Sequence, residues 1–419
     1  MGCNSTIMDI TKKILSDPIN KWIFKTAQEL NTDIYIVGGY MRDLLRGLKS
    51  NDKDFALKSK VEDIARKITK KFNGTFIVLK HKQTYRVVLK TKEALDFSYL
   101  NGSINNDLKE RDFTINAIAW SPKTGIIDPF SGRKDLNKRI IKAVMIKNLL
   151  NDPLRIIRAY RIGAELRFKI ETNTRKYLKI YSPKITKAAS ERITEEFFKI
   201  LTNKNPVNYL NECCTDKVLI KILSQGCCAQ KKHNKKINAL NQNMNLLNRL
   251  DLFLKNNLKD KKISHYLDEE ISQKLNGLGL LRLSILFRNY SIANSNLKVS
   301  NNINKALKDI HNGMEALKSN ISDTELYKIF NASGERIFEM SFLLAFIRRK
   351  NIKEIFKRAD EYLKIKNKIL LNGDDVQRIL NIEPGTKVGN ILSALQEEKF
   401  KGTIKTRAEA RKWLLSNFT

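Results

Sequence analysis

Apolar and polar positions divide the chain into a first part with strands and helices and a second part with helices. An apolar run at Ile34–Val37 predicts a strand, and apolar residues at helical spacing from Val61 to Phe72 predict an amphipathic helix. Three strand-like runs follow: TFIVL, TYRVVLK and ALDFSYL. Another strand is expected from Thr114, and residues 128–144 predict a turn, a short helix and a strand. We therefore expect a mixed sheet of about five strands with helices.

From Asn151 onwards the pattern is helical, and no strand is predicted. Asp152 is expected to cap a helix that begins at Pro153, and Ala189–Leu201 predicts a further helix. The lysine-rich segments KKHNKK and KDKKIS are interpreted as exposed turns or linkers. The tail predicts a turn at Pro384-Gly385, then a helix, and a final helix from Arg407. The expected fold class is therefore α+β, with the sheet in the first part only.

The charge of the chain points to its partner. The sequence has 78 Lys+Arg against 44 Asp+Glu, a formal net charge of +34. Such a positive field favours nucleic acid as partner over a merely solvated lysine-rich surface. No apolar run is long enough to cross a bilayer and no signal peptide is visible, so we expect a cytoplasmic protein without a membrane partner.

Cysteine and histidine give no sign of a metal centre. The doublets Cys213-Cys214 and Cys227-Cys228 do not have the CxxC spacing of zinc ribbons, so buried reduced thiols are the expected state. None of the four histidines is followed by Asp. The sequence therefore gives no indication of a His-Asp phosphohydrolase site.

Candidate chemistry begins at the end of the first strand. Gly38 and Gly39 follow it directly, and glycines there let backbone N–H groups approach a phosphate closely. Asp52 and Asp54 lie two residues apart, so in a strand they face one way while Lys53 faces the other. Two carboxylates beside a phosphate cradle are typical of a protein that holds Mg²⁺ on a triphosphate. Taken alone, the glycines are equally a plain turn, and DKD is equally a solvated acidic loop. The two motifs together, in this order, favour a site for Mg²⁺ and a triphosphate.

Further charged residues lie in the next segments. Asp96 alternates with apolar neighbours in its strand and is a candidate third carboxylate. Arg111 and Asp112 lie at the entrance of the next predicted strand, where a guanidinium could reach a phosphate or a base. In the helix after Asp152, three arginines at intervals of three spread over an arc of roughly 120° and favour a phosphate or base site. They are Arg155, Arg158 and Arg161.

Six motifs in order carry a family resemblance: GGYMRD, DKD, RDFTINA, DPFSGRKDL, NDPLRIIRAYR and SERI. This set resembles the class II tRNA nucleotidyltransferases and the related bacterial poly(A) polymerases over about the first half of the chain. The tail, from NGDD to the last helix, is similar to the C-terminal segment of some bacterial members.

The resemblance implies a four-part architecture. Residues 1–145 would form a polymerase-β-like catalytic head, and residues 146–205 a helical neck that recognises the base. Residues 206–365 would form a helical RNA-binding body, and residues 366–419 a helical tRNA-binding tail. The implied partners are tRNA, CTP and ATP, and the implied cofactor is Mg²⁺.

The resemblance also implies roles for single residues. Asp52 and Asp54 match the metal-binding carboxylates of the family. Triphosphate and nucleotide contacts match Gly39, Arg42, Arg111, Arg158 and Arg161, with Gly38 beside them. Asp152 and Arg155 match the pair that reads the incoming base. Ser190, Glu191 and Arg192 match the element that braces the head against the neck.

The Asp152–Arg155 pair suits this role chemically. Asp can only accept and Arg can only donate hydrogen bonds. Cytosine and adenine offer an amino donor next to a ring-nitrogen acceptor, whereas uracil and guanine offer the reverse. An Asp–Arg pair therefore selects C and A without a nucleic-acid template.

Three departures from the family pattern limit what the resemblance implies. Asn151 stands where family members usually have an acid, and the middle region has no His-Asp pairs. Sixteen positions separate Asp96 from Asp112, a shorter span than in family members that add the whole CCA. This short span resembles the CC-adding branch, so CC-only addition is an alternative to the expected addition of CCA, or part of it, to tRNA 3′ ends. Poly(A) polymerase is another enzymatic alternative, and an RNA-binding protein with an inactive head is the alternative from another class.

Overall fold

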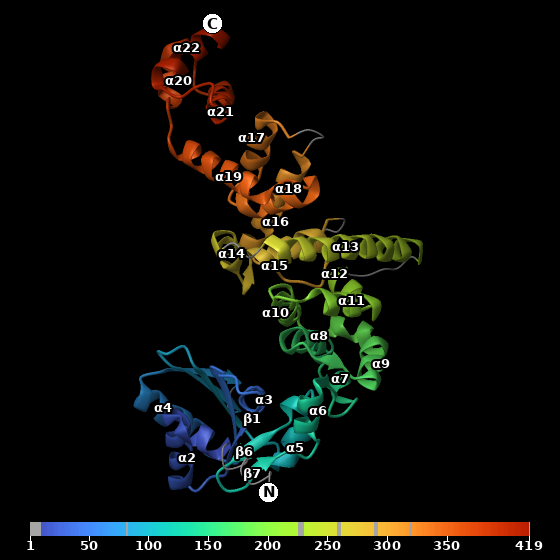
Figure 1. Cartoon of the computed structure of the whole chain (residues 1–419). Helices are drawn as coiled ribbons and strands as arrows, with labels where there is room; N and C mark the ends of the chain where they lie inside the picture. Colours follow the sequence, from blue (N-terminus) through green and yellow to red (C-terminus); the bar gives the residue numbers. More distant parts are fainter. Residues whose placement is uncertain are drawn as a thin grey trace. The chain divides into compact units, whose positions relative to one another are not determined.

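The computed structural model describes residues 10–80, 83–224, 230–257, 261–288, 292–317 and 321–418. The chain forms two compact units (Figure 1), one of residues Met1–Glu196 with Asn208–Ile222 and one of Phe197–Val207 with Leu223–Thr419. The division predicted from the sequence, with boundaries after residues 145, 205 and 365, stays a prediction.

The first unit is built on a mixed seven-stranded sheet. Its order is β3-β4-β5-β2-β1-β6-β7, and only the β2–β5 pair is parallel. The strands are β1 (Ile34–Val37), β2 (Asp52–Leu57), β3 (Thr75–Lys80), β4 (Thr84–Val88), β5 (Ala94–Tyr99), β6 (Ala119–Ser121) and β7 (Gly125–Ile127). The expected mixed sheet with helices is confirmed, although it has seven strands where about five were predicted.

Helices α2 (Pro18–Glu29) and α4 (Val61–Phe72) cover one face of this sheet (Figure 1). Helix α4 has the predicted bounds, and it carries Glu62 and Asp63 in its first turn, where negative charge suits the helix dipole. Along β2, Phe55 and Leu57 pack into the core beneath the helices, whereas Ala56 belongs to a smaller cluster on the opposite face. The alternation of the strand therefore places Asp54 on the face that α2 and α4 leave open.

The prediction for the segment around Thr114 was wrong. Thr114–Asn116 forms a 3₁₀ helix, and the strand begins only at Ala119. The Thr114 hydroxyl donates to Asp135, and a Cβ on Gly132 would lie 2.1 Å from the Thr114 carbonyl oxygen, so close tertiary packing holds the tight turn. Strand β7 was not predicted.

Helices α3 (Gly39–Leu45), α5 (Ile104–Lys109) and α6 (Gly132–Lys138) complete this part. Helix α5 was not predicted from the polar segment before Glu110, although the Ser103 hydroxyl caps it by accepting from the Asn106 N–H. Strand β8 (Ile140–Ile141) pairs outside the large sheet, in parallel with β9 (Lys169–Ile170), so a strand does occur after Asn151.

The rest of the first unit is largely helical. It contains α7 (Asn148–Asn151), α8 (Leu154–Leu166), α9 (Thr172–Tyr181), most of α11 (Val207–Thr215) and most of α12 (Val218–Leu223), and α10 (Ser190–Leu201) crosses the division between the units after Glu196. Helix α8 begins one residue later than predicted, with Pro153 at its N-cap. Asp152 still satisfies the helix start, because its Oδ1 accepts from the Leu154 N–H at 3.3 Å.

The second unit consists of helices and one short hairpin. Its elements are α13 (Gln230–Asn257), α14 (Lys261–Asp268), β10 (Glu270–Ser272), β11 (Leu275–Asn276), α15 (Gly277–Leu286), α16 (Asn301–Glu315), α17 (Asp323–Ala332), α18 (Ile337–Arg348), α19 (Ile352–Asn367), α20 (Gly373–Leu380), α21 (Thr386–Lys401) and α22 (Arg407–Phe418). The hairpin β10–β11 was not predicted. The last three helices enclose a core of their own, and the predicted final helix from Arg407 is confirmed.

Both predicted lysine-rich linkers were wrong where the structure describes them. KKHNKK lies inside α13, and the last four residues of KDKKIS lie in α14, while its first two are outside the described residues. Lysine is a good helix former, so a run of lysines interrupts a helix only where glycine, proline or a turn accompanies it.

Cys213 is buried, and burial raises the pKa of its thiol well above the ordinary range. Cys214 is half-buried, and burial raises the pKa of its thiol as well, so the predicted burial holds for Cys213 and in part for Cys214. Cys3 and Cys227-Cys228 lie outside the described residues. Among the described helices, none has the length and apolar content needed to cross a bilayer.

Candidate active site

A cavity of about 410 Å³ in the first unit collects the predicted site residues. Every one of them lines it except Asp152. The lining residues are Gly38, Gly39, Tyr40, Arg42, Asp43, Ser50, Asp52, Asp54, Arg86, Asp96, Arg111, Asp112, Asn116, Arg155, Arg158 and Arg161.

The register of the sheet brings the carboxylates together. Asp54 on β2 lies directly opposite Asp96 on β5, and Asp96 lies opposite Arg86 on β4. Asp52 is exposed at the start of β2. Burial raises the pKa of Asp54; Arg111 opposes this shift, and the negative charges of Asp96 and Asp52 add to it. Three carboxylates therefore gather on the open face of the sheet.

The glycine turn lies directly against this charge. Gly38 has φ +76°, which a residue with a side chain rarely adopts. A Cβ at this position would lie 2.7 Å from Nη1 of Arg111 and 3.0 Å from Oδ2 of Asp54. The backbone conformation therefore favours glycine at position 38, and a side chain there would displace the Arg111 guanidinium.

Two arginines near the turn are held in place by neighbouring side chains. Arg42 donates through Nε and Nη2 to Asp43, and through Nη1 to Asn116 at 2.9 Å. Arg111 donates to Asp107 of α5 at 3.1–3.2 Å. Helix α5, within the short span between Asp96 and Asp112, therefore orients an arginine of the cavity.

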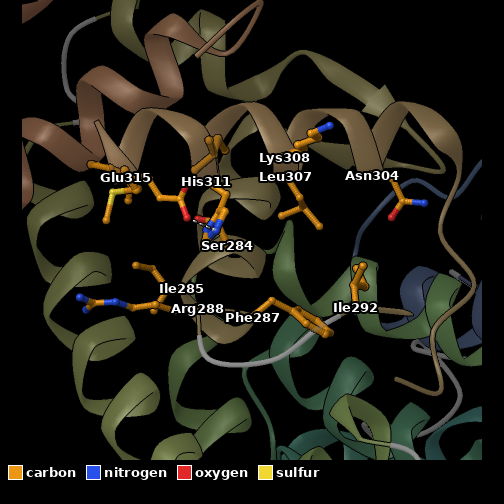
Figure 2. Close-up of a pocket in the computed structure, with 13 residues that line it drawn as sticks. Ser284, Ile285, Phe287, Arg288, Ile292, Asn304, Leu307, Lys308, His311 and Glu315 are labelled. Atoms are coloured by element: carbon orange, nitrogen blue, oxygen red, sulfur yellow. Dashed lines mark ion pairs between the residues drawn. The ribbon is translucent and has the colours of Figure 1, made fainter. Parts of the chain in front are cut away.

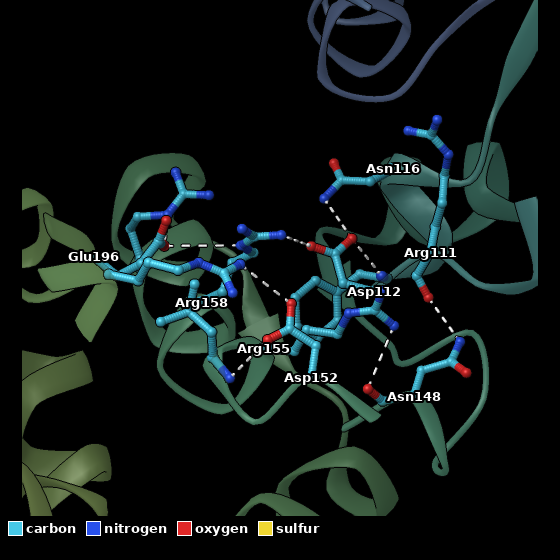
Figure 3. A network of polar contacts seen from close by, with 12 residues as sticks. Arg111, Asp112, Asn116, Asn148, Asp152, Arg155, Arg158 and Glu196 are labelled. Carbon is cyan, nitrogen blue, oxygen red and sulfur yellow. Dashed lines mark hydrogen bonds and ion pairs between the residues drawn. The ribbon is translucent and has the colours of Figure 1, made fainter. Parts of the chain in front are cut away.

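Asp112 is the centre of a polar network (Figure 3). It accepts from the Phe113 N–H at 2.7 Å, from Asn116 Nδ2 at 3.0 Å and from Arg158 Nη1 at 3.4 Å. Burial alone would raise the pKa of Asp112, but Arg158 and these hydrogen bonds outweigh burial and lower it. Asp112 thus stays ionised while buried, and it connects the 3₁₀ helix at residues 114–116 to α8.

The three arginines of α8 have different surroundings. Arg161 donates to Glu196 at 2.5 Å and to Glu165 at 2.7 Å. Arg155 donates through Nη1 to the Asn148 carbonyl at 3.4 Å, and its Nε is buried without a hydrogen-bond partner among the described residues (Figure 3). Burial lowers the pKa of Arg155, although nearby acids oppose that shift.

Asp152 lies beside the cavity without lining it. Its Oδ2 accepts from Arg192 Nη2 at 3.4 Å, so Arg192, one of the residues matched to the bracing element, contacts a residue matched to base recognition. Asp152 and Arg155 are neighbours at the start of α8, with Asp152 just before the helix.

Sequence reasoning missed several lining residues. Arg86 alternates with the buried Tyr85 and Val87 in β4, and this alternation could have revealed an inward-facing charge next to Asp96. Asn116 and Asp43 position Arg42, and only the three-dimensional contacts reveal this function.

A larger cavity, of about 720 Å³, lies in the second unit (Figure 2). Its wall is mainly apolar, with Arg288, Lys308 and an ion pair of 3.0 Å between His311 and Glu315. It does not contain the paired carboxylates or the glycine turn. The candidate chemistry therefore belongs to the cavity of the first unit.

Comparison with known proteins agrees with this assignment. Residues 34–142 match the family model for the poly A polymerase head domain, residues 167–225 the model for the RNA- and SrmB-binding site of polymerase A, and residues 288–413 the model for domain 2 of tRNA nucleotidyltransferases. The resemblance to the tRNA nucleotidyltransferases and poly(A) polymerases is confirmed.

Individual relatives span nearly the whole chain. The chain is 28% identical to the CC-adding tRNA nucleotidyltransferase of Geobacter sulfurreducens, covering 96% of this chain and 95% of that protein. It is 29% identical to the CCA-adding enzyme of Ligilactobacillus salivarius, and the match covers 91% of this chain and 92% of that protein. The Thermotoga maritima CCA-adding enzyme, solved in complex with tRNA, shares the fold with a TM-score of 0.71 at 20% identity, over 99% of this chain and 98% of that one.

Proposed function

We propose that the protein is a template-independent tRNA nucleotidyltransferase that adds C and A residues, as CCA or part of it, to tRNA 3′ ends from CTP and ATP. The observation that carries the proposal is the cavity where the glycine turn, the carboxylates of Asp52, Asp54 and Asp96, and the α8 arginines meet. The full-length relatives with CC-adding and CCA-adding activity support it. Its setting would be the cytoplasm, where the net charge of +34 would attract tRNA.

The donor set suits Mg²⁺. Among the described residues, no group of three or more His, Cys, Asp or Glu side chains forms a complete metal site. Mg²⁺ on a nucleotide is instead held by one or two carboxylates together with substrate phosphates. Asp52 and Asp54 would hold the ion. Its charge would offset burial and the neighbouring carboxylates, which raise the pKa of Asp54, and it would polarise the reacting phosphate.

The residues of the chain provide the remaining functions. In the reaction, the 3′-hydroxyl of the RNA attacks the α-phosphorus, a new phosphodiester forms, and pyrophosphate leaves. Gly38 and Gly39 allow the triphosphate to approach the backbone, and Arg42 and Arg111 neutralise it from fixed positions. Asp96 is the candidate third carboxylate beside Asp54.

Base choice would reside in α8. Asp152 and Arg155 present an acceptor and a donor for the edges of C and A, with Arg158 and Arg161 as further nucleotide contacts. Arg192 restrains Asp152 by donating a hydrogen bond to it. The Nε of Arg155 has no hydrogen-bond partner among the described residues, so this donor is available to the incoming base.

CC-only addition is the second candidate. Helix α5 takes up six residues of the short span between Asp96 and Asp112, and Asp107 of that helix accepts hydrogen bonds from Arg111. A span folded in this way offers less chain for a loop that rearranges between C and A addition. Poly(A) polymerase and an RNA-binding protein with an inactive head remain the further alternatives.

The substitution Asp52→Ala tests the enzymatic proposal. An enzyme should lose nucleotide incorporation and keep tRNA binding, because Asp52 is exposed and lies in the cavity. Asp63→Ala, on the exposed side of α4, is the matched control and should keep both. A wild-type protein that binds tRNA but incorporates nothing would instead favour the RNA-binding alternative.

A further inference from the structure

Arg86 faces the cavity beside the carboxylates, and the proposed function leaves it without a role. Four neighbouring strands place residues of different chemistry in one row. Arg86 on β4 lies opposite Asp96 on β5, Asp96 lies opposite Asp54 on β2, and Asp54 lies opposite Val37, the last residue of β1 before the glycine turn. The row therefore runs from a guanidinium, across two carboxylates, to the turn.

The two ends of this row are well separated. Neighbouring strands lie about 4.8 Å apart, so the three spacings from β4 to β1 amount to roughly 14 Å. Gly38 and Arg42 mark the β1 end, which the proposed function assigns to the triphosphate. Arg86 marks the β4 end.

The geometry of phosphoryl transfer assigns a substrate to the β4 end. The attacking and leaving oxygens lie roughly in line on opposite sides of the phosphorus. If pyrophosphate leaves towards the glycine turn, the 3′-hydroxyl and the RNA that carries it approach from the side of Arg86. This step rests on the proposed function.

Arg86 is prepared to bind an anion. Its Nε donates to Asp96 Oδ1 at 2.6 Å and its Nη2 donates to Oδ2 at 2.7 Å. These bonds use two of the five N–H donors of a guanidinium and fix its plane. The side chain is 40% exposed, so its other edge is accessible from the cavity.

We propose that Arg86 binds the 3′-terminal phosphodiester of the acceptor RNA and that Asp96 is the positioning residue that holds Arg86 for this contact. The contact places the last nucleotide of the acceptor, and with it the attacking hydroxyl, beside the carboxylates. Lysine at this position would retain the charge but lose the two-point attachment to Asp96.

Steady-state kinetics with CTP and a tRNA that lacks CCA test this contact. Arg86→Met should raise the KM for tRNA about tenfold or more, since a charge-assisted hydrogen bond is lost, and leave the KM for CTP unchanged. Arg86→Lys should lie between Arg86→Met and wild type. Arg66→Met is the matched control, because Arg66 lies on α4, is 61% exposed and does not line the cavity.

An acceptor with a neutral methylphosphonate as its last phosphodiester provides the decisive comparison. The neutral linkage should lower kcat/KM about tenfold in wild type and far less in Arg86→Met, because the charge that it removes has no partner there. Equal losses in both proteins, or a raised KM for CTP alone, would overturn the proposal. Thermal melts confirm that the variants are folded.

A binding experiment tests the Arg86 contact independently of the proposed function. Equilibrium binding of the natural and the methylphosphonate tRNA can be measured without nucleotide. If wild type incorporates nothing, the proposed function fails, but a binding loss that depends on Arg86 would still support the contact. No difference between the two tRNAs in binding would contradict it.

Discussion

Gly38 and Asp54 are so close that a single added methyl group at position 38 would lie 3.0 Å from the Asp54 carboxylate oxygen. The same methyl group would lie 2.7 Å from the Arg111 guanidinium. The turn expected to admit the triphosphate therefore lies directly against the carboxylate expected to hold its metal.

Gly38→Ala should reduce nucleotide incorporation by 10-fold or more, with a stability loss of about 1–2 kcal/mol from the positive φ. Gly47→Ala is the control, since Gly47 has φ +74° but no atom within 4 Å of an added Cβ. It should show the same strain in urea unfolding and retain full incorporation. Equal activity losses in the two variants would contradict a special role for Gly38.

Asp54→Asn should raise the melting temperature at neutral pH while abolishing incorporation. The pKa of Asp54 is raised by burial, so the folded state binds the proton more tightly than the unfolded chain, and ionisation at neutral pH opposes folding. Each 1 kcal/mol corresponds to roughly 2–4 °C in a unit of this size.

Mg²⁺ gives the complementary result for the same residue. It should raise the melting temperature of wild type and leave Asp54→Asn unchanged, and EDTA should reverse the shift. An equal Mg²⁺ shift in both proteins would place the ion elsewhere.

Asp112 gives the opposite pH dependence. Its pKa is lowered, so its stabilising contribution is complete above the unfolded value of about 3.9 and is lost as pH falls through the folded pKa. The difference in unfolding free energy between wild type and Asp112→Asn should therefore shrink below about pH 4. A difference that grows with acid would refute the assignment.

Asp152→Ala should weaken the preference for CTP and ATP over UTP and GTP by roughly 10–100-fold, the discrimination that a good hydrogen-bonded pair provides. Arg192→Met should have a smaller effect in the same direction, because it frees Asp152 without removing its acceptor. Competition assays with all four nucleotides measure both. Unchanged preference in Asp152→Ala would remove this residue from base recognition.

Strand alternation was sufficient to predict the carboxylate face of the site. It placed Asp52 and Asp54 together and turned Lys53 away from them, and the structure agrees. Alternation could not show where Lys53 goes: its ammonium is buried and pairs with Asp17 at 2.6 Å and Glu93 at 3.1 Å, residues 36 and 40 positions away. Such long-range pairs leave no periodic signal.

The remaining misses have local causes. Thr114 looked like a strand residue because it is β-branched, but the close approach of Gly132 holds it in a 3₁₀ turn. Helix α5 has only six residues, too few for a helical spacing of apolar residues to be recognised. Its N-cap at Ser103 was the one local signal for it. The lysine-rich start of α13 resembled a linker because of its high charge, but lysine also has a high helix propensity.

The central claim is tested most directly by incubating the protein with Mg²⁺ and tRNAs that end before CCA, after C, or after CC. CTP and ATP are supplied separately and together, and product lengths are resolved on one gel. We expect CTP to extend the first two acceptors to CC, with Asp52→Ala inactive on all of them, and extension of the third by ATP would distinguish CCA from CC-only addition. Failure of every acceptor to incorporate C, or long A tails from ATP alone, would contradict a tRNA nucleotidyltransferase.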